Sequence, residues 1–334
     1  MYMVELIANV NNAINGFVWG VPMLVLLVGT GILMTILTKF FQLSHIAHWF
    51  KNTVGGIFHD KHVTKHTDAD DQSISQFQSL CTALAATIGT GNIVGVASAL
   101  VAGGPGAIFW MWIVAFFGMM TNYSENVLGI YYRRRNSRGE WSGGAMYYLK
   151  DGLGSYKGCK QIGAVLAVLF SAFCLLASFG IGNMSQVNSI AANMTSAFSI
   201  PATVTGIVLV IIGALVIVGG LKRIAAVTEK LVPFMAIAYV IGALIIFFAN
   251  ISHVGAVFTA IFKGAFGLRA VGGGIVGSGV KLALTWGMKR GVFSNEAGLG
   301  SSVMVHSSSN VKSPYVRVCG ASSKSSPTPW SYVH

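Results

Sequence analysis

The sequence predicts an all-helical integral membrane protein, and three observations support this fold class. Hydrophobic residues make up 54% of the chain and charged residues only 10%, whereas soluble domains carry about 25% charge. The apolar residues gather in runs of about 20, the length that crosses a bilayer as a helix. Lys and Arg concentrate in alternate connections between these runs, as the positive-inside rule requires of a polytopic chain.

Seven hydrophobic spans are expected. The first lies too far from the N-terminus to be a signal peptide and lacks a basic segment before it. The fourth should continue as a more polar helix up to Pro201, and the seventh contains the ionisable Lys289, Arg290 and Glu296. The predicted spans are residues 17–37, 82–102, 106–130, 162–182, 203–221, 231–250 and 284–308.

The basic loops predict the orientation of the chain in the membrane. They follow the first, third and fifth spans, whereas residues 1–16, 103–105 and 183–202 contain no Lys or Arg. We therefore expect the N-terminus outside a bacterial plasma membrane. The bases behind the net charge of +12 are segregated along the chain, and because no nucleic-acid motif accompanies them, we expect no nucleic-acid partner.

Residues 39–77 form the longest cytoplasmic connection and should begin with an amphipathic helix at the membrane interface. Farther along, His59, His62 and His66 could share one helix face and bind a metal. A solvated loop is the favoured alternative, because the segment has no Cys and no shielding apolar flank. The four cysteines of the chain form no CxxC pattern and are read as small apolar residues.

Residues 78–132 carry the most informative feature, an apolar helix interrupted by Gly89-Thr90-Gly91-Asn92. In lipid, a broken helix leaves peptide N–H and C=O groups unpaired at a cost of several kcal/mol each. Transporters tolerate such a break where it forms part of a binding site. The interruption therefore predicts a membrane transporter with this break as half of its site. A simple kink with tight helix packing, suggested by Gly91-x-x-x-Gly95, is the alternative.

Several separated motifs are similar to those of one transporter family. TALAATIGTGNIVGVASAL, GGAMYYLKDGLG, GNMSQVNS and RGVFSNEAGLGSS resemble the alanine/glycine:cation symporter family over most of residues 1–311. The resemblance implies a leucine-transporter-like inverted-repeat core, one extra N-terminal helix, and coupling to sodium or protons. Residues 312–334 are Ser- and Pro-rich and do not resemble the family, so we expect an incomplete second repeat followed by a tail of other origin. An inactive truncated fragment is an alternative outcome.

The expected substrate is a small neutral amino acid: alanine, glycine or D-alanine. Its carboxylate is best met by free N–H groups where the half-helix resumes, assigned to Thr90, Gly91 and Asn92. Sodium prefers oxygen ligands, which carbonyls freed just before the break can supply. The expected sodium ligands are the carbonyl oxygens of Ala86, Thr87 and Ile88.

The segment RGVFSNEAGLGSS should provide the second half of the site. Ser294 and Asn295 can receive the substrate ammonium or coordinate the ion, and Phe293 can close over the substrate. The alternative is a short loop, because ionisable side chains are costly at the membrane midplane. We expect the backbone to unwind at two glycines, Gly291 and Gly298.

Two further side chains have competing interpretations. Gln186, in GNMSQVNS, is a candidate for binding the amino-acid headgroup, although amides also bridge packed helices. Glu125 is either a proton-carrying or gating carboxylate or an interface acid paired with a base, and we favour the latter because acids near helix ends reach water.

The sequence also argues against an enzyme or a channel. No HExxH, GxSxG or Walker signature is present, and no organic cofactor is expected. Discontinuous helices favour alternating access over a continuous pore. The absence of an unambiguous midplane carboxylate favours Na⁺ as the coupling ion, with a proton-coupled amino-acid transporter as the alternative. The oligomeric state is left open.

Overall fold

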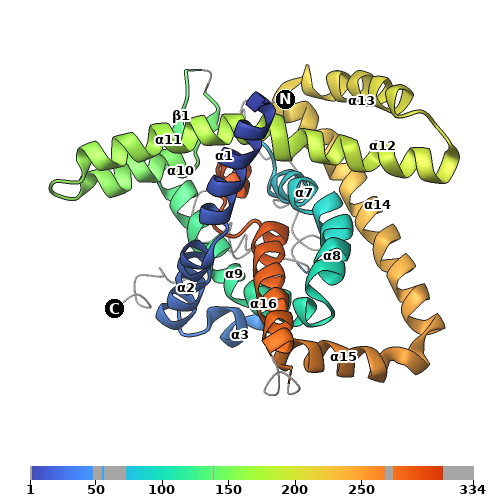
Figure 1. Cartoon of the computed structure of the whole chain (residues 1–334). Helices are drawn as coiled ribbons and strands as arrows, with labels where there is room; N and C mark the ends of the chain where they lie inside the picture. The colour runs from blue at the N-terminus through green and yellow to red at the C-terminus, as the bar shows by residue number, and fades with distance from the viewer. Residues whose placement is uncertain (1, 48–54, 56–72, 138, 268–273, 311–334) are drawn as a thin grey trace. The chain divides into compact units, whose positions relative to one another are not determined.

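The computed structural model describes residues 2–47, 55, 73–137, 139–267 and 274–310 (Figure 1). These residues form helices, apart from one short β-hairpin. The chain divides into two compact units. Unit 1 comprises residues 1–44, 95–122 and 253–298, and unit 2 comprises residues 45–94, 123–252 and 299–334.

The helices follow the apolar runs of the sequence. Pro22 stands in the first turn of α2, where its missing N–H costs nothing, and Ser75 with Gln78 forms a capping box at the start of α7. The elements are α1 (Tyr2–Val18), α2 (Val21–Leu37), α3 (Phe41–Ser44), α7 (Gln76–Thr87), α8 (Thr90–Gly103), α9 (Gly106–Tyr131), β1 (Arg134–Arg135), β2 (Trp141–Ser142), α10 (Ala145–Tyr147), α11 (Lys160–Phe179), α12 (Ser185–Phe198), α13 (Ala202–Ile217), α14 (Gly220–Ala249), α15 (Val254–Phe266), α16 (Gly274–Asn295) and α17 (Ser301–Ser307).

Among the residues that the structure describes, five helical stretches are long and apolar enough to cross a bilayer, and α13 and residues 251–266 are shorter apolar helices. The third predicted span coincides with α9, and the fourth continues through a π-helical turn into α12, as expected. The second and seventh are broken helices, α7–α8 and α16–α17. The five stretches are Glu5–Leu37, Gln76–Gly103, Gly106–Tyr131, Lys160–Phe198 and Gly220–Ala249.

In unit 1, α9 packs against α2 and α16 through glycines. A Cβ added at Gly31 of α2 would lie 2.7 Å from the carbonyl oxygen of Phe117, and one added at Gly291 of α16 would lie 3.0 Å from Cβ of Val114. Small residues let membrane helices approach this closely. Gly291 thus lies inside a continuous helix, so the expectation that the backbone unwinds there is wrong.

In unit 2, polar side chains join α7 to α14. Gln78 Nε2 donates to a carboxylate oxygen of Glu229 at 2.9 Å, and the hydroxyls of Thr82 and Thr228 are 2.9 Å apart. Such hydrogen bonds hold helices together where lipid offers no hydrophobic driving force.

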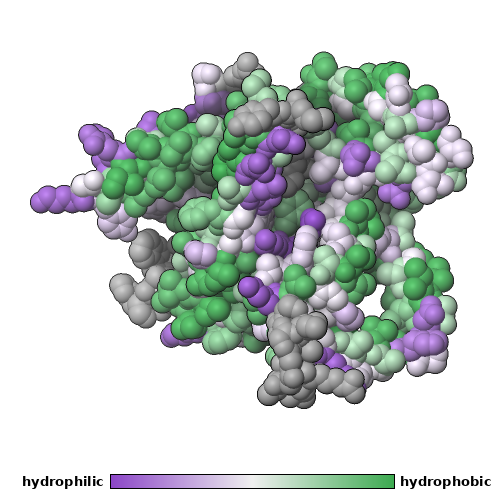
Figure 2. Space-filling model, viewed as in Figure 1, coloured by the Kyte–Doolittle hydropathy of each residue, from purple (hydrophilic) through white to green (hydrophobic). Residues whose placement is uncertain are grey.

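Large apolar side chains remain exposed along the long helices (Figure 2). On α14, for example, Phe234, Ile245 and Ile246 are each more than half exposed. A soluble protein would rarely present such continuous apolar surface. These faces therefore fit a lipid environment, and the chain is a multi-pass membrane protein.

Candidate functional site

The first helix break lies at Ile88 and Gly89, between α7 and α8. Ile88 has φ −85° and ψ 81°, values outside the helical region. The helix resumes at Thr90, so Thr90, Gly91 and Asn92 form the first turn of α8 rather than an unwound segment. The N–H groups of a first turn have no intrahelical partners. The predicted carboxylate-binding residues therefore lie in the first turn of a helix, where the Asn92 N–H donates to the carbonyl oxygen of Gly89 at 3.1 Å.

Gln186 of α12 lies against this first turn within unit 2. Its Oε1 accepts from the backbone N–H of Thr90 at 3.0 Å and from the Thr90 hydroxyl at 2.5 Å. A Cβ added at Gly89 would lie 3.0 Å from Gln186 Nε2, so the amide would have to shift by a few tenths of an ångström to admit a side chain there. An uncharged side-chain oxygen thus occupies the donors that an anion would use at a helix N-terminus.

A π-helical turn precedes Gln186. Residues Gly180–Met184 form this turn between α11 and α12. A π turn inserts an extra residue into a helix and rotates everything that follows, and such turns are frequent at functional sites.

Asn92 bridges the two sides of the break. Its Nδ2 donates to the carbonyl oxygen of Thr87 at 3.0 Å, and the N–H of Gly89 donates to the same oxygen at 3.1 Å. Of the three predicted sodium ligands, Thr87 therefore has a carbonyl that already accepts two hydrogen bonds. The sodium site at Ala86, Thr87 and Ile88 stays a prediction.

The second break separates α16 from α17 at residues 296–300. Glu296, Gly298 and Gly300 take φ values of 54°, 85° and 71°. Glycine adopts this left-handed region at little cost, whereas Glu296 does so with strain. The prediction that the helix is interrupted at Gly298 is confirmed.

Asn295 ends α16 in unit 1. Its Oδ1 accepts from the N–H of Ala297 at 3.1 Å, and its backbone oxygen accepts from Asn122 Nδ2 at 3.4 Å. Its Nδ2 is buried and has no acceptor among the residues that the structure describes. Because Oδ1 is already in use, the free group suits a carboxylate or water better than an ammonium or a cation.

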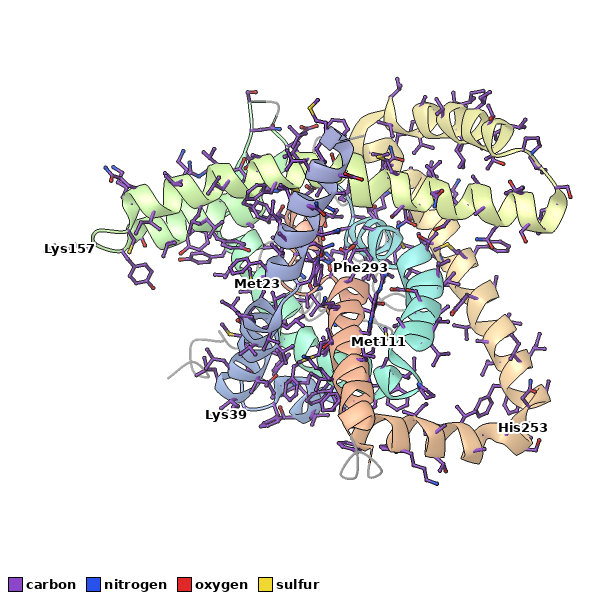
Figure 3. All side chains as sticks on the ribbon, viewed as in Figure 1. Met23, Lys39, Met111, Lys157, His253 and Phe293 are labelled. Carbon is purple, nitrogen blue, oxygen red and sulfur yellow. The ribbon has the colours of Figure 1, made fainter. Side chains whose placement is uncertain are left out.

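Phe293 and Ser294 precede Asn295 in the last turn of α16, and Figure 3 shows Phe293 at this end of the helix. The Arg290 guanidinium carbon lies 5.9 Å from the centre of the Phe293 ring. Phe293, Ser294 and Asn295 belong to unit 1, whereas Thr90, Gly91, Asn92 and Gln186 belong to unit 2. Their assignment to one substrate site stays a prediction.

Sequence reasoning missed a polar cluster around Arg133 in unit 2. Arg133 Nη1 donates to the carbonyl oxygens of Ser307 at 3.0 Å and Ser309 at 2.6 Å, and the guanidinium lies 4.0 Å from the Trp141 ring centre. A cation at the end of α17 satisfies helix carbonyls and interacts favourably with the helix dipole. Arg133 was considered only as one charge of a basic loop, and no local motif indicates its partners.

Glu125 lies in the part of α9 that belongs to unit 2. Burial raises the pKa of Tyr148, and the nearby Glu125 carboxylate raises it further. A neutral phenol is therefore kept beside the acid. This proximity does not distinguish the proton-carrying role of Glu125 from the interface role.

The histidine hypothesis stays a prediction, because His59, His62 and His66 lie outside the described residues. In the described part of the chain, no three His, Cys, Asp or Glu side chains form a metal-binding group. Of the predicted interfacial helix, the structure describes α3 and the residues up to 47.

Two interrupted helices with amides and hydroxyls at the breaks, in a multi-pass membrane protein, define a secondary transporter rather than an enzyme. Residues 4–321 match the sodium:alanine symporter family. The chain belongs to this family of sodium-coupled membrane amino-acid symporters.

Individual relatives agree with the family assignment. The chain is 47% identical over 303 residues to the sodium/alanine symporter AgcS of Methanococcus maripaludis, covering 91% of this chain and 63% of that protein. It is 44% identical over 313 residues to an uncharacterized transporter of Haemophilus influenzae, covering 92% and 64%. It is 39% identical over 302 residues to a putative sodium/proton-dependent alanine carrier, YrbD of Bacillus subtilis, covering 90% and 57%. The chain therefore spans about three fifths of the length of these relatives.

Proposed function

We propose that the protein is a sodium-coupled symporter of small neutral amino acids, namely alanine, glycine or D-alanine. The observation that carries this proposal is the first turn of α8, whose Thr90 N–H is held by the Gln186 amide oxygen at 3.0 Å. In the proposed mechanism, the substrate carboxylate takes over this donor. The partial positive charge of a helix N-terminus then stabilises the carboxylate.

In this proposal, Gln186 has different hydrogen-bond partners in the substrate-free and the substrate-bound protein. Without substrate, its Oε1 satisfies Thr90. With substrate, the same amide turns to the amino-acid headgroup, so Thr90 and Gln186 have hydrogen-bond partners in both states. The Asn295 Nδ2, buried and without an acceptor among the described residues, is a second donor suited to a carboxylate.

Sodium is proposed to bind the carbonyl oxygens of Ala86, Thr87 and Ile88. For Thr87 to take part, its carbonyl must release the Asn92 amide that it now accepts at 3.0 Å. Ion binding would then release the Asn92 side chain, in the first turn of the substrate half-helix. This gives a local physical reason for coupling between the ion and the substrate.

Tight packing near Gly89 supports the proposal of a small substrate. A Cβ there would already crowd Gln186, which favours amino acids with almost no side chain. Relatives nevertheless differ: one of them, 35% identical, is named a probable sodium/glutamine symporter. One methyl group is worth about 1 kcal/mol in an apolar pocket, so closely related sites can prefer different substrates.

Equilibrium binding of radiolabelled L-alanine to the 334-residue chain in lipid nanodiscs tests the proposal. We expect saturable binding in NaCl that weakens at least tenfold in choline chloride, with competition by glycine and D-alanine but not by glutamine. Binding that is independent of sodium but strengthens as the pH falls would support the proton-coupled alternative. An absence of saturable alanine binding in both salts would refute the proposal.

A further inference from the structure

Arg290 of α16 places a positive charge among apolar groups in unit 1. Its guanidinium carbon lies 6.0 Å from the ring centre of Trp286 and 5.9 Å from that of Phe293. These residues stand four positions before and three positions after Arg290, so all three share one face of the helix. The two rings hold the guanidinium from either side along α16.

A stripe of small residues on α8 supports the same guanidinium. A Cβ added at Gly95 would lie 3.5 Å from Arg290 Nη1, and one added at Gly103 would lie 2.9 Å from Cβ of Trp286. Gly95, Ala99 and Gly103 recur every four residues and are all buried. The Arg290 side chain therefore approaches α8 at Gly95, and Trp286 approaches the same helix at Gly103.

None of these neighbours neutralises the charge. Within the described part of the chain, no ion pair or hydrogen bond involving Arg290 is found. Cation–π contacts at about 6 Å are weak, and they do not satisfy the hydrogen-bonding capacity of a guanidinium. The five N–H donors of the guanidinium are positioned but unused.

We propose that Arg290 is a carboxylate-binding residue, distinct from the first turn of α8, and that it engages its ligand through two parallel N–H···O bonds. Arginine matches a carboxylate in this bidentate way. The inference rests on the proposed function for one point, the source of the ligand. In an amino-acid symporter the substrate's own α-carboxylate is at hand, and an acidic side chain of the protein is the other source.

Chemical protection tests the site without requiring transport. Phenylglyoxal modifies accessible arginines, and mass spectrometry of the peptide containing Arg290 gives its modification rate in nanodiscs. We expect acetate to slow this rate, by roughly tenfold at concentrations about ten times its Kd, because protection scales with occupancy. Chloride at the same ionic strength should have little effect. An Arg290 rate that is the same in acetate and chloride would overturn the inference.

Two ligands distinguish the sources of the carboxylate. Protection by L-alanine but not by L-alaninamide, which lacks the carboxylate, identifies the amino acid as the ligand. Protection by acetate alone assigns the site to an acidic side chain and leaves Arg290 a carboxylate-binding residue. Calorimetry of L-alanine on the same sample reports the proposed function separately. Alanine that binds while acetate and alanine both fail to protect Arg290 overturns this inference alone.

Tryptophan fluorescence provides a second test that does not require Arg290 to react with phenylglyoxal. Trp286 lies next to the guanidinium, so acetate binding should change the tryptophan fluorescence of the parent chain. Arg290→Gln should bind acetate at least tenfold more weakly than the parent chain and therefore lose this fluorescence response. Lys289→Gln removes the adjacent positive charge on the same helix and is the matched control, which should respond as the parent does. An equal response in Arg290→Gln and Lys289→Gln contradicts the inference.

Discussion

Replacing Gly89 by alanine tests the contact on which the proposed substrate site depends. The new Cβ would lie 3.0 Å from Gln186 Nε2 and 3.3 Å from Oε1, closer than carbon usually approaches, so the amide must move. Moving it breaks the two hydrogen bonds from Thr90, at 3.0 and 2.5 Å. Each contributes about 1 kcal/mol net. Alanine also stabilises the folded protein by about 0.4–1 kcal/mol, because it reduces the conformational entropy of the unfolded chain. This gain applies here because φ at Gly89 is not positive, so alanine can adopt the same backbone conformation.

The expected net loss is about 1–1.5 kcal/mol in the free energy of unfolding of the substrate-free protein. A thiol-reactive dye can follow thermal unfolding in detergent, because Cys81 is buried and becomes exposed as the protein unfolds. Gly206→Ala is the control: it lies within α13, and a Cβ there meets nothing within 4 Å. We expect Gly89→Ala to melt a few degrees below Gly206→Ala. If Gly89→Ala melts at or above the control, the packing of Gln186 on the helix break is wrong.

Three other substitutions test separate parts of the account. Asn92→Ala removes the bridge to the Thr87 carbonyl, so the sodium concentration that half-activates alanine binding should change several-fold; an unchanged sodium dependence contradicts a role in coupling. Phe293→Ala should enlarge the site and let bulkier neutral amino acids such as leucine compete with radiolabelled alanine, whereas an unaltered substrate profile excludes Phe293 from the pocket. Arg133→Gln removes two charge-assisted hydrogen bonds to the end of α17, so amide hydrogen exchange in residues 301–310 should accelerate at least tenfold. The exposed Lys157 (Figure 3) provides the control Lys157→Gln, and equal exchange in both variants would show that Arg133 does not hold this segment.

Much of the fold could be predicted because a bilayer restricts the possibilities to helices of suitable length. The span predicted at 106–130 appears as Gly106–Tyr131, between a glycine-rich turn and a cluster of arginines. Among the described residues, two of the longer helices were not predicted. Tyr2–Val18 contains Glu5 and several asparagines, and Val254–Phe266 has only 13 residues. Neither has the uniform apolar length that hydropathy detects. The inverted-repeat arrangement stays a prediction.

The candidate site was less accessible to sequence reasoning. The break near Gly89 could be predicted, since glycine and small polar residues interrupt an apolar run. The contact of Gln186 with Thr90, 96 positions apart, depends on a π-helical turn that no sequence pattern indicated. The position of Arg290 between two rings likewise depends on helix packing. Its charge was visible in the sequence, but its lack of a partner among the described residues was not.

Hydrogen exchange at Thr90 measures the central claim directly, namely that N–H groups in the first turn of α8 bind the substrate carboxylate. Peptides that cover residues 86–95 should be compared in nanodiscs with no ligand, with L-alanine plus sodium, and with L-alaninamide plus sodium. We predict that L-alanine slows exchange of the Thr90, Gly91 and Asn92 amides severalfold, and that L-alaninamide does not. Saturable binding of L-alanine without slower exchange in this peptide, or equal protection by L-alaninamide, would contradict the account.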